Sequence, residues 1–305
     1  MNYSILKYIL GYVLKIEAAF MLLPCITSLI YQEEEGRYFF LVSCVCMLLG
    51  VLMTYRKPKN TVFYLKEGCL ATSLSWIILS LFGAIPFWIS GEIPRWEDAL
   101  FETISGFTTT GATILGDVEA LSHTVLIWRS FTHWIGGMGV LVFLLAILPL
   151  SGGSSINLMK AESPGPSVGK LVPKVRYTAM ILYTIYFGMT VIEFIFLLAG
   201  KMPLFDALTT AFGTAGTGGF GIKNDSIMGY SPYIQWVVAI FMILFGINFN
   251  FYFYIIYRHF RKAVSMEEIH YYLAMILIAV TIIFLNIRTM YPTGFEAMTH
   301  SVFQV

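Results

Sequence analysis

The chain has 305 residues, of which 57% are hydrophobic, 16% aromatic and only 12% charged. An ordinary soluble domain carries roughly 25% charged residues, so this composition excludes a disordered chain and argues against a soluble enzyme. Nineteen Lys and Arg stand against 18 Asp and Glu, a formal net charge of +1, whereas a nucleic-acid-binding domain normally shows a basic excess. The composition therefore indicates a membrane protein that does not bind nucleic acid.

Seven apolar stretches are long enough to cross the hydrocarbon core of a bilayer, which takes about 20 residues of helix. They lie at about 5–30, 38–54, 69–91, 124–150, 177–199, 232–257 and 268–288. The first stretch is too long for a cleaved signal peptide and no small-residue cleavage site follows it, so we expect a retained anchor. The pattern predicts an all-α, polytopic membrane protein.

The distribution of Lys and Arg over the loops predicts the orientation of the chain. Thirteen of these residues lie near the N-terminus and in the loops around 56–66, 160–176 and 258–262, and six lie on the opposite side. By the positive-inside rule, the N-terminus is expected in the cytoplasm. Most acidic residues, Glu102 among them, fall on the outer side, where they form either a solvated rim or a surface that concentrates cations before entry.

Three segments between the apolar stretches resemble one another, and they lie at 96–113, 204–221 and 294–305. In the first two, an aspartate precedes a glycine by 13 residues, namely Asp98 before Gly111 and Asp206 before Gly219. Each segment is too short and too polar to span a bilayer. We expect re-entrant hairpins, in which a short helix enters from outside and an extended Thr/Gly segment returns, because irregular backbone at membrane depth must be buried or line a watery cavity.

The span–hairpin–span units divide the chain into four parts. We predict a peripheral two-helix pair at 1–60, a first pore repeat at 61–160, a second at 161–264 and an incomplete third at 265–305. The acids that open the three hairpins are expected to cap the free N–H groups of the short helices, with ion binding as the alternative. These acids are Asp98, Asp206 and Glu296.

The Thr/Gly segments have the chemistry that a dehydrated monovalent cation needs. Channels replace the hydration shell with backbone carbonyl oxygens held in extended segments, and glycine adopts backbone angles that aim such carbonyls at an axis. Threonine hydroxyls add oxygen ligands, and the C-terminal end of a short helix favours a cation. The segments that meet these needs are Thr109, Thr110 and Gly111, and Thr217, Gly218 and Gly219.

The same residues and their neighbours resemble the Trk/Ktr/HKT superfamily of potassium transporters, and within it the TrkH-type subunits. The resemblance rests on FETISGFTTTGAT at 101–113, WIGGMG at 134–139, AESPGP at 161–166 and GGF at 218–220, and it extends from about residue 68 to the last residue. It implies four repeats around one pore and potassium uptake through a Thr/Gly filter. Potassium would be bound by Thr110, Gly111, Gly218 and Gly219.

The resemblance also implies a location and partners. We expect a multi-pass subunit of the bacterial cytoplasmic membrane, in contact with lipid, that carries potassium and needs no cofactor. A cytoplasmic ring of nucleotide-binding subunits would gate it, and the full-length protein would be a homodimer. Because this chain stops within the third hairpin, we expect a truncated gene or a fragment that conducts no potassium by itself.

A proton- or sodium-coupled cation symporter is the alternative interpretation. It needs an ionisable residue at mid-membrane, and Glu193 is the better candidate, since Glu17 lies near Lys15 and is expected to contact it. A membrane enzyme is not expected, because the sequence has no Ser/His/Asp set, HExxH motif or clustered carboxylate pair.

Polar and small residues in the fourth stretch also have expected roles. His123, Arg129 and His133 are expected to make structural hydrogen bonds. The glycines at 136–139 predict close helix packing, with a flexible gate as the alternative. The basic loop at 160–176 is either an anchor on the cytoplasmic side or a docking site for the gating ring.

Overall fold

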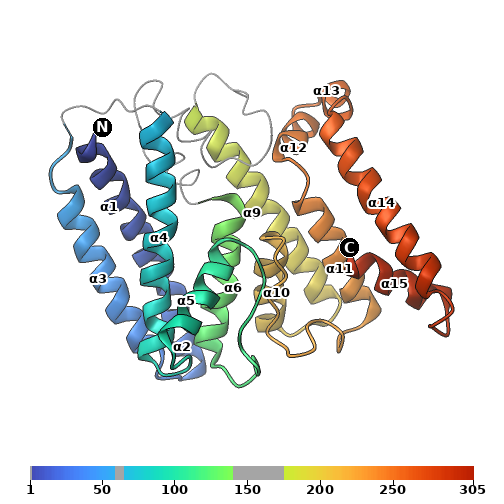
Figure 1. Ribbon diagram of the computed structural model, residues 1–305, viewed down its shortest axis with the longest axis horizontal. Helices are drawn as coiled ribbons and strands as arrows, with labels where there is room; N and C mark the ends of the chain where they lie inside the picture. Colours follow the sequence, from blue (N-terminus) through green and yellow to red (C-terminus); the bar gives the residue numbers. More distant parts are fainter. Residues whose placement is uncertain (1, 59–64, 140–174) are drawn as a thin grey trace.

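The computed structural model describes residues 2–58, 65–139 and 175–305, and this part of the chain consists of helices joined by loops (Figure 1). The helices are α1 (Tyr3–Phe20), α2 (Leu22–Tyr31), α3 (Gly36–Thr54), α4 (Leu65–Ile89), α5 (Trp96–Phe107), α6 (His123–Met138), α9 (Val175–Ala199), α10 (Leu204–Ala215), α11 (Pro232–Phe245), α12 (Phe249–Ile256), α13 (Phe260–Val264), α14 (Glu267–Ile287) and α15 (Gly294–Gln304). No strand occurs within the described ranges, so the all-α prediction is confirmed.

Five helical segments in the described part are long and apolar enough to cross a membrane. They are α1 with α2 as one segment, α3, α4, α9 and α14. The predicted span at 232–257 is wrong as a single helix, because α11 and α12 meet at an angle of 90°. The predicted span at 124–150 is described only as far as residue 139, and its remainder lies outside the described residues.

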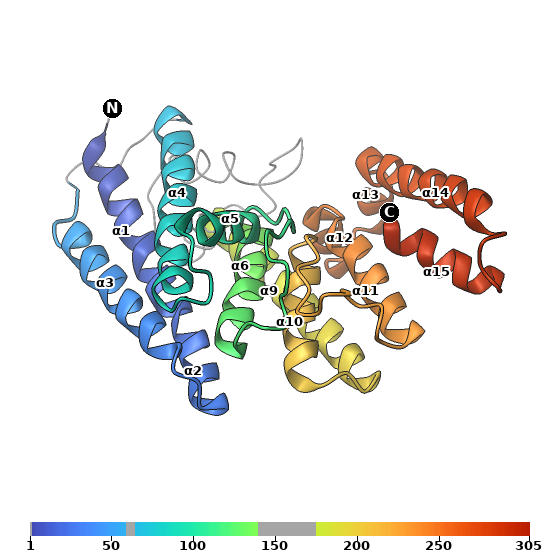
Figure 2. The ribbon, with the colours of Figure 1, turned by 60° about the horizontal axis from the view of Figure 1, so that its bottom comes forward.

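The helices follow one another from one end of the molecule to the other (Figure 2). Helices α1, α3 and α4 form the N-terminal end, α6, α9 and α10 form the centre, and α11, α14 and α15 form the opposite end. The N-terminus and α13 lie at the same edge of the molecule, at the top of Figure 1. The short helices α5, α10 and α15 do not run from edge to edge; α15 slopes back from the lower edge and ends at mid-height.

Helices α1 and α3 pack closely because two glycines lie at their crossing. A Cβ atom on Gly50 would lie 2.7 Å from the carbonyl oxygen of Gly11 and 2.7 Å from Cγ of Lys15. Small residues of this kind let helices approach until their backbones touch, which gains van der Waals contact where lipid offers no hydrophobic driving force. Nearby, the Ser43 hydroxyl donates to the carbonyl of Ala18 at 2.7 Å.

A carboxylate from the peripheral helices binds the beginning of α6. Glu33, in the loop between α2 and α3, accepts hydrogen bonds from the backbone N–H groups of His123 and Thr124 at 2.9 and 2.8 Å. It also contacts the Thr124 hydroxyl at 2.6 Å and Nδ1 of His123 at 2.8 Å. A negative charge at a helix N-terminus satisfies free N–H groups and interacts favourably with the helix dipole. This contact fixes the loop between α2 and α3 against the start of α6.

The acids that open the hairpins do not cap them. Helix α5 starts after Arg95 and α10 after Pro203, and neither residue makes a side-chain capping bond. Asp206 accepts instead from the Tyr230 hydroxyl at 2.6 Å. In α15 the cap is Thr293, whose hydroxyl accepts from the N–H of Glu296. The capping prediction is therefore wrong, although all three acids lie in the first helical turn, where their charge suits the dipole.

The break between α11 and α12 leaves carbonyl groups that two tyrosines satisfy. The Tyr272 hydroxyl of α14 donates to the carbonyl of Ile243 at 3.1 Å, and the Tyr252 hydroxyl donates to that of Leu244 at 2.6 Å. Asn248 then caps the new helix by accepting from the N–H of Asn250. Backbone groups freed at membrane depth need such partners.

The crossing of α1 and α3 generates the first prediction. Gly50→Ala should lower the free energy of unfolding in detergent by about 1–3 kcal/mol, because the methyl group forces two backbones apart. The matched control is Gly188→Ala in α9, where the added Cβ meets no atom within 4 Å among the described residues beyond its chain neighbours and the adjacent backbone of its own helix. A stability loss in the control as large as in the Gly50 variant would contradict the packing argument.

The Glu33 contact predicts a pH dependence. Burial acts to raise the pKa of Glu33, but the hydrogen bonds from Thr124 and His123 outweigh it and hold the pKa below its ordinary value. The stability that Glu33 contributes is thus present above its ordinary pKa and is lost as the pH falls through the lowered value. Between about pH 7 and pH 3, the melting temperature should fall less for Glu33→Gln than for the native chain. Glu34→Gln, at an exposed neighbour, should follow the native curve.

Candidate functional site

The two complete hairpins repeat the same backbone geometry. Helices α5 and α10 each have 12 residues and each leads into a Thr/Gly segment. In the first Thr/Gly segment (109–111), φ is +53° at Thr109 and +75° at Gly111; in the second (217–219), φ is +56° at Thr217 and +71° at Gly219. A β-branched residue with positive φ is a genuine outlier, and backbone strain of this kind clusters at ligand-binding sites.

The two Thr/Gly segments touch each other through their backbones. A Cβ atom on Gly111 would overlap the carbonyl oxygen of Gly218, and one on Gly218 would lie 2.6 Å from the carbonyl oxygen of Thr109. The structure therefore brings together Thr109, Gly111 and Gly218 from two hairpins more than 100 residues apart in the sequence. Only glycine fits at position 111, for steric reasons as well as for its positive φ.

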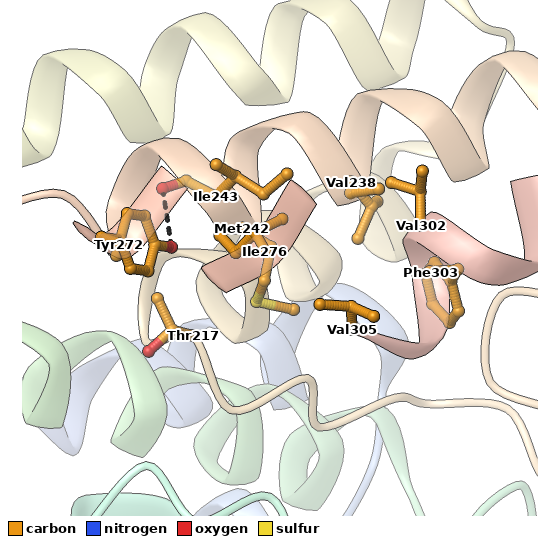
Figure 3. Close-up of a pocket in the computed structure, with 11 residues that line it drawn as sticks. Thr217, Val238, Met242, Ile243, Tyr272, Ile276, Val302, Phe303 and Val305 are labelled. Atoms are coloured by element: carbon orange, nitrogen blue, oxygen red, sulfur yellow. Dashed lines mark hydrogen bonds between the residues drawn. The ribbon is translucent and has the colours of Figure 1, made fainter. Parts of the chain in front are cut away.

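The other three predicted residues lie at the edges of this contact. The Thr110 hydroxyl is paired with that of Thr108 at 2.8 Å, so it braces its own segment. Thr217 is exposed and lines a cavity of about 340 Å³ together with residues of α11, α14 and α15 (Figure 3). Gly219 faces the same side, since a Cβ there would lie 3.6 Å from Cε of Met242, which also lines the cavity.

Helix α6 stands between the ends of the two short helices. A Cβ on Gly136 would overlap the carbonyl oxygen of Phe107, the last residue of α5. One on Gly137 would lie 3.0 Å from the carbonyl oxygen of Ala215, the last residue of α10. The close packing predicted for these glycines is what the structure shows, and it places both helix C-termini, with their partial negative charge, against one helix.

A buried ion pair connects the two hairpins through the residues that follow their Thr/Gly segments. Arg129 of α6 and Glu102 of α5 lie 2.8 Å apart, with side chains 2% and 0% exposed. Glu102 also accepts from the Thr113 hydroxyl at 2.6 Å and from the N–H of Ile114 at 2.7 Å, just after the first Thr/Gly segment. Arg129 donates to the carbonyl of Gly221 at 2.7 Å, just after the second. The pair thus fixes both returning segments.

The role of this pair differs from what the sequence suggested. Glu102 is fully buried and does not belong to an outer rim, and Arg129 is a charged partner and not only a hydrogen-bonding residue. The guanidinium carbon of Arg129 also lies 3.7 Å from the centre of the Phe220 ring, a cation–π contact. The pair could not be predicted from the sequence, because opposite charges 27 residues apart carry no periodic signal; their position inside otherwise apolar helices was the available clue.

The loops beyond the two segments are joined as well. Asn224 accepts from the N–H of Val118 at 2.8 Å and donates to Asp117 at 2.8 Å, and its own N–H donates to Glu119 at 3.1 Å. The hydrogen bond from the Asn224 amide lowers the pKa of Asp117 below its ordinary value. The two hairpins therefore form one unit from the buried ion pair to the surface loops.

The two intramembrane glutamates are buried, and Glu193 lies beside Thr214, three residues before the second Thr/Gly segment. Glu17 is 1% exposed and Glu193 0% exposed, and their carboxylate oxygens have no hydrogen-bond partner among the described residues. The contact expected between Glu17 and Lys15 is wrong, because the Lys15 ammonium lies over the Tyr12 ring at 4.8 Å.

The fold and the site define a class of protein: a polytopic membrane protein whose re-entrant hairpins present strained Thr/Gly backbone at membrane depth, as cation-conducting proteins do. A family model for TrkH, described as a cation transport protein, matches residues 35–300. The chain belongs to the TrkH family.

Individual relatives agree with this assignment. The chain is 36% identical over 260 residues to the Trk system potassium uptake protein TrkH of Salmonella typhimurium and, with the same figures, to that of Escherichia coli K12; the matches cover 83% of this chain and 53% of each relative. It is 31% identical to TrkH of Halomonas elongata, with all of this chain and 64% of that protein covered. The crystal structure of the potassium transporter TrkH from Vibrio parahaemolyticus superimposes with a TM-score of 0.84 at 27% identity, over all of this chain and 64% of that one.

The chain thus spans about half the length of the Salmonella and Escherichia relatives that it matches. The shared family and the matching structure confirm the predicted resemblance and the predicted fold class. The division of the chain into pore repeats and the choice of potassium-binding residues stay predictions.

The buried ion pair generates the third prediction. Glu102→Gln or Arg129→Gln alone should lower the free energy of unfolding in detergent by about 3–5 kcal/mol, because each leaves an uncompensated buried charge. The double variant Glu102→Gln/Arg129→Gln should lose less than the sum of the singles, with a coupling energy of about 1–3 kcal/mol. Lys223→Gln removes the exposed pair with Glu119 and should leave the melting temperature unchanged. Strict additivity of the two buried substitutions would refute the pair as a unit.

Proposed function

We propose that this chain supplies two oxygen-lined segments of a potassium pathway and acts as the ion-translocating subunit of a Trk-type uptake system. The observation that carries the proposal is the repeated positive-φ pattern of Thr109–Gly111 and Thr217–Gly219, with the carbonyl oxygen of Gly218 held against Gly111. Backbone carbonyls held in this way replace the water that a potassium ion loses. The potassium ligands are drawn from Thr109, Thr110, Gly111, Thr217, Gly218 and Gly219.

Two features around the segments support ion passage. The C-terminal ends of α5 and α10 face the segments, and their partial negative charge stabilises a cation there. The cavity beside Thr217, lined mostly by apolar residues and by the Tyr272 hydroxyl, offers a space through which the ion would continue (Figure 3). An apolar lining holds an ion weakly, as conduction requires.

Partners follow from the family and from the relatives' names. Those of Salmonella and Escherichia are named potassium uptake proteins of a Trk system, so potassium is the proposed substrate. The proposal includes a cytoplasmic ring of nucleotide-binding subunits, a homodimer, and an N-terminus in the cytoplasm of a bacterial cell. Of the loop at 160–176, proposed as the docking site, residues 160–174 lie outside the described residues.

A proton- or sodium-coupled symporter is the second candidate, and Glu193 favours it. This carboxyl group is fully buried in α9 without a hydrogen-bond partner in the described part of the chain, and buried acids in membrane helices often carry coupling ions. Flux in liposomes decides between the two: potassium flux that needs neither a proton nor a sodium gradient supports the first candidate.

The fourth prediction tests the potassium pathway by complementation. The chain is joined to the part of Vibrio parahaemolyticus TrkH that the structural match leaves uncovered, and the chimaera is expressed in bacteria that lack potassium uptake. Growth at low potassium is expected. Gly111→Asp should abolish it without changing the amount of protein in the membrane, because the new side chain meets the Gly218 carbonyl.

The matched control for this test is Gly116→Asp in the same loop. Apart from the two chain neighbours of Gly116, no atom in the described ranges lies within 4 Å of a Cβ added there, so the same side chain should be tolerated. Undiminished potassium uptake by the Gly111 variant would disprove the assignment of the first Thr/Gly segment.

A further inference from the structure

Helix α6 carries a buried histidine that none of the interactions above uses. His133 is 0% exposed, and both of its ring nitrogens lack a hydrogen-bond partner among the described residues. Leaving a buried polar group unpaired costs free energy, so a group of this kind calls for an explanation. The sequence prediction of an ordinary structural hydrogen bond at this residue is wrong in the described structure.

The ring of His133 contacts the second Thr/Gly segment directly. A Cβ atom on Gly218 would overlap Nε2 of His133 and lie 3.0 Å from its Cδ2. A Cβ on Gly216 would lie 2.7 Å from the carbonyl oxygen of His133. The backbone from Gly216 to Gly218 thus runs along this one residue, with no room for a side chain between them.

The same ring also holds the residue that follows the segment. Its centre lies 4.2 Å from the centre of the Phe220 ring, which Arg129 covers with its guanidinium. Arg129 and His133 are four residues apart and therefore share one face of α6. Because α6 belongs to the first hairpin unit, two side chains of that unit support the segment contributed by the second.

Gly218 is consequently enclosed on two sides. On one side its carbonyl oxygen faces Gly111 of the first Thr/Gly segment, and on the other a Cβ atom added to its α-carbon would meet both the imidazole ring of His133 and the carbonyl oxygen of Thr109. The size of the ring limits how far Gly218 can move toward α6. The distance between the oxygens that would surround an ion depends on this limit.

We propose that His133 is a positioning residue that determines ion specificity by holding Gly218 at a fixed distance from the first Thr/Gly segment. The inference rests on the proposed function. Cation selectivity depends either on the size of the oxygen cage or on the number and field strength of its carbonyls, and a shift of Gly218 changes both. Removing the ring leaves a void that the segment relaxes into.

The first test needs no transport. Hydrogen–deuterium exchange is measured on the purified 305-residue chain in detergent, at the amides of Thr217 and Gly219, which donate to Thr214 and Gly213 in the native structure. His133→Ala should speed exchange there by roughly tenfold or more, with no change at the amides of the first Thr/Gly segment. His133→Gln, which keeps bulk and a polar group near Nε2, should restore protection.

The second test measures specificity in the chimaera. Potassium uptake is followed with sodium as the competitor. His133→Ala should lower the preference for potassium over sodium by roughly tenfold, while His133→Gln keeps most of it. The matched control is Ser130→Ala, since the Ser130 hydroxyl is also buried and unpaired within the described part of α6 and contacts neither segment in the interactions described above.

The outcomes separate the two proposals. If the unmutated chimaera takes up no potassium, the proposed function fails, and exchange still tests the support of Gly218. Unchanged exchange in His133→Ala overturns the inference. Faster exchange with unchanged selectivity also overturns it, because His133 would then stabilise the segment without setting specificity. Equal effects of Ser130→Ala and His133→Ala on selectivity would assign the effect to α6 as a whole and refute the specific role.

Discussion

The buried contact between Glu102 and Arg129 is the interaction on which the arrangement of the two hairpins depends. Removing two charges from water costs several kcal/mol per ion, and only good geometry with further hydrogen bonds offsets it. Here the second Glu102 oxygen accepts from Thr113 and Ile114, and a second Arg129 nitrogen donates to Gly221. The residues that make these further hydrogen bonds directly follow the two Thr/Gly segments in the chain. The interactions that stabilise the buried charges therefore also position the two segments.

Helix α6 joins the two hairpins by packing against both of them. It contacts the last residue of α5 through Gly136 and the last residue of α10 through Gly137, and its polar face touches the backbone of the second hairpin. Neither Thr/Gly segment is held by its own hairpin alone. The geometry of each is thus a property of the pair, which accounts for the matching positive φ values in segments whose sequences differ at the middle residue, Thr110 against Gly218.

The sequence was sufficient for five of the seven predicted spans and for the two complete hairpins, because mean hydropathy and an equal aspartate-to-glycine spacing are local or repeated signals. It was insufficient where a structure depends on one distant partner. Glu102 was assigned to the outer rim because the sequence gives its charge and its place in the chain but not its burial. No proline in the sequence predicts the bend after Phe245. The tyrosine hydroxyls of α12 and α14 stabilise it by donating to free carbonyl groups at the end of α11. Caps were misassigned because first-turn acids and true caps share residue types.

The donation from Arg129 to Gly221 has a consequence for biosynthesis. These residues are 92 positions apart, and chains grow at about 5–20 residues per second, so α6 enters the membrane roughly 5–18 seconds before its acceptor exists. During that interval a guanidinium N–H in the nascent chain must be satisfied by water or by the translocation machinery. The first hairpin and α6 are thus synthesised without the hydrogen bond from Arg129 to Gly221. That bond can form only after the ribosome has made the second hairpin.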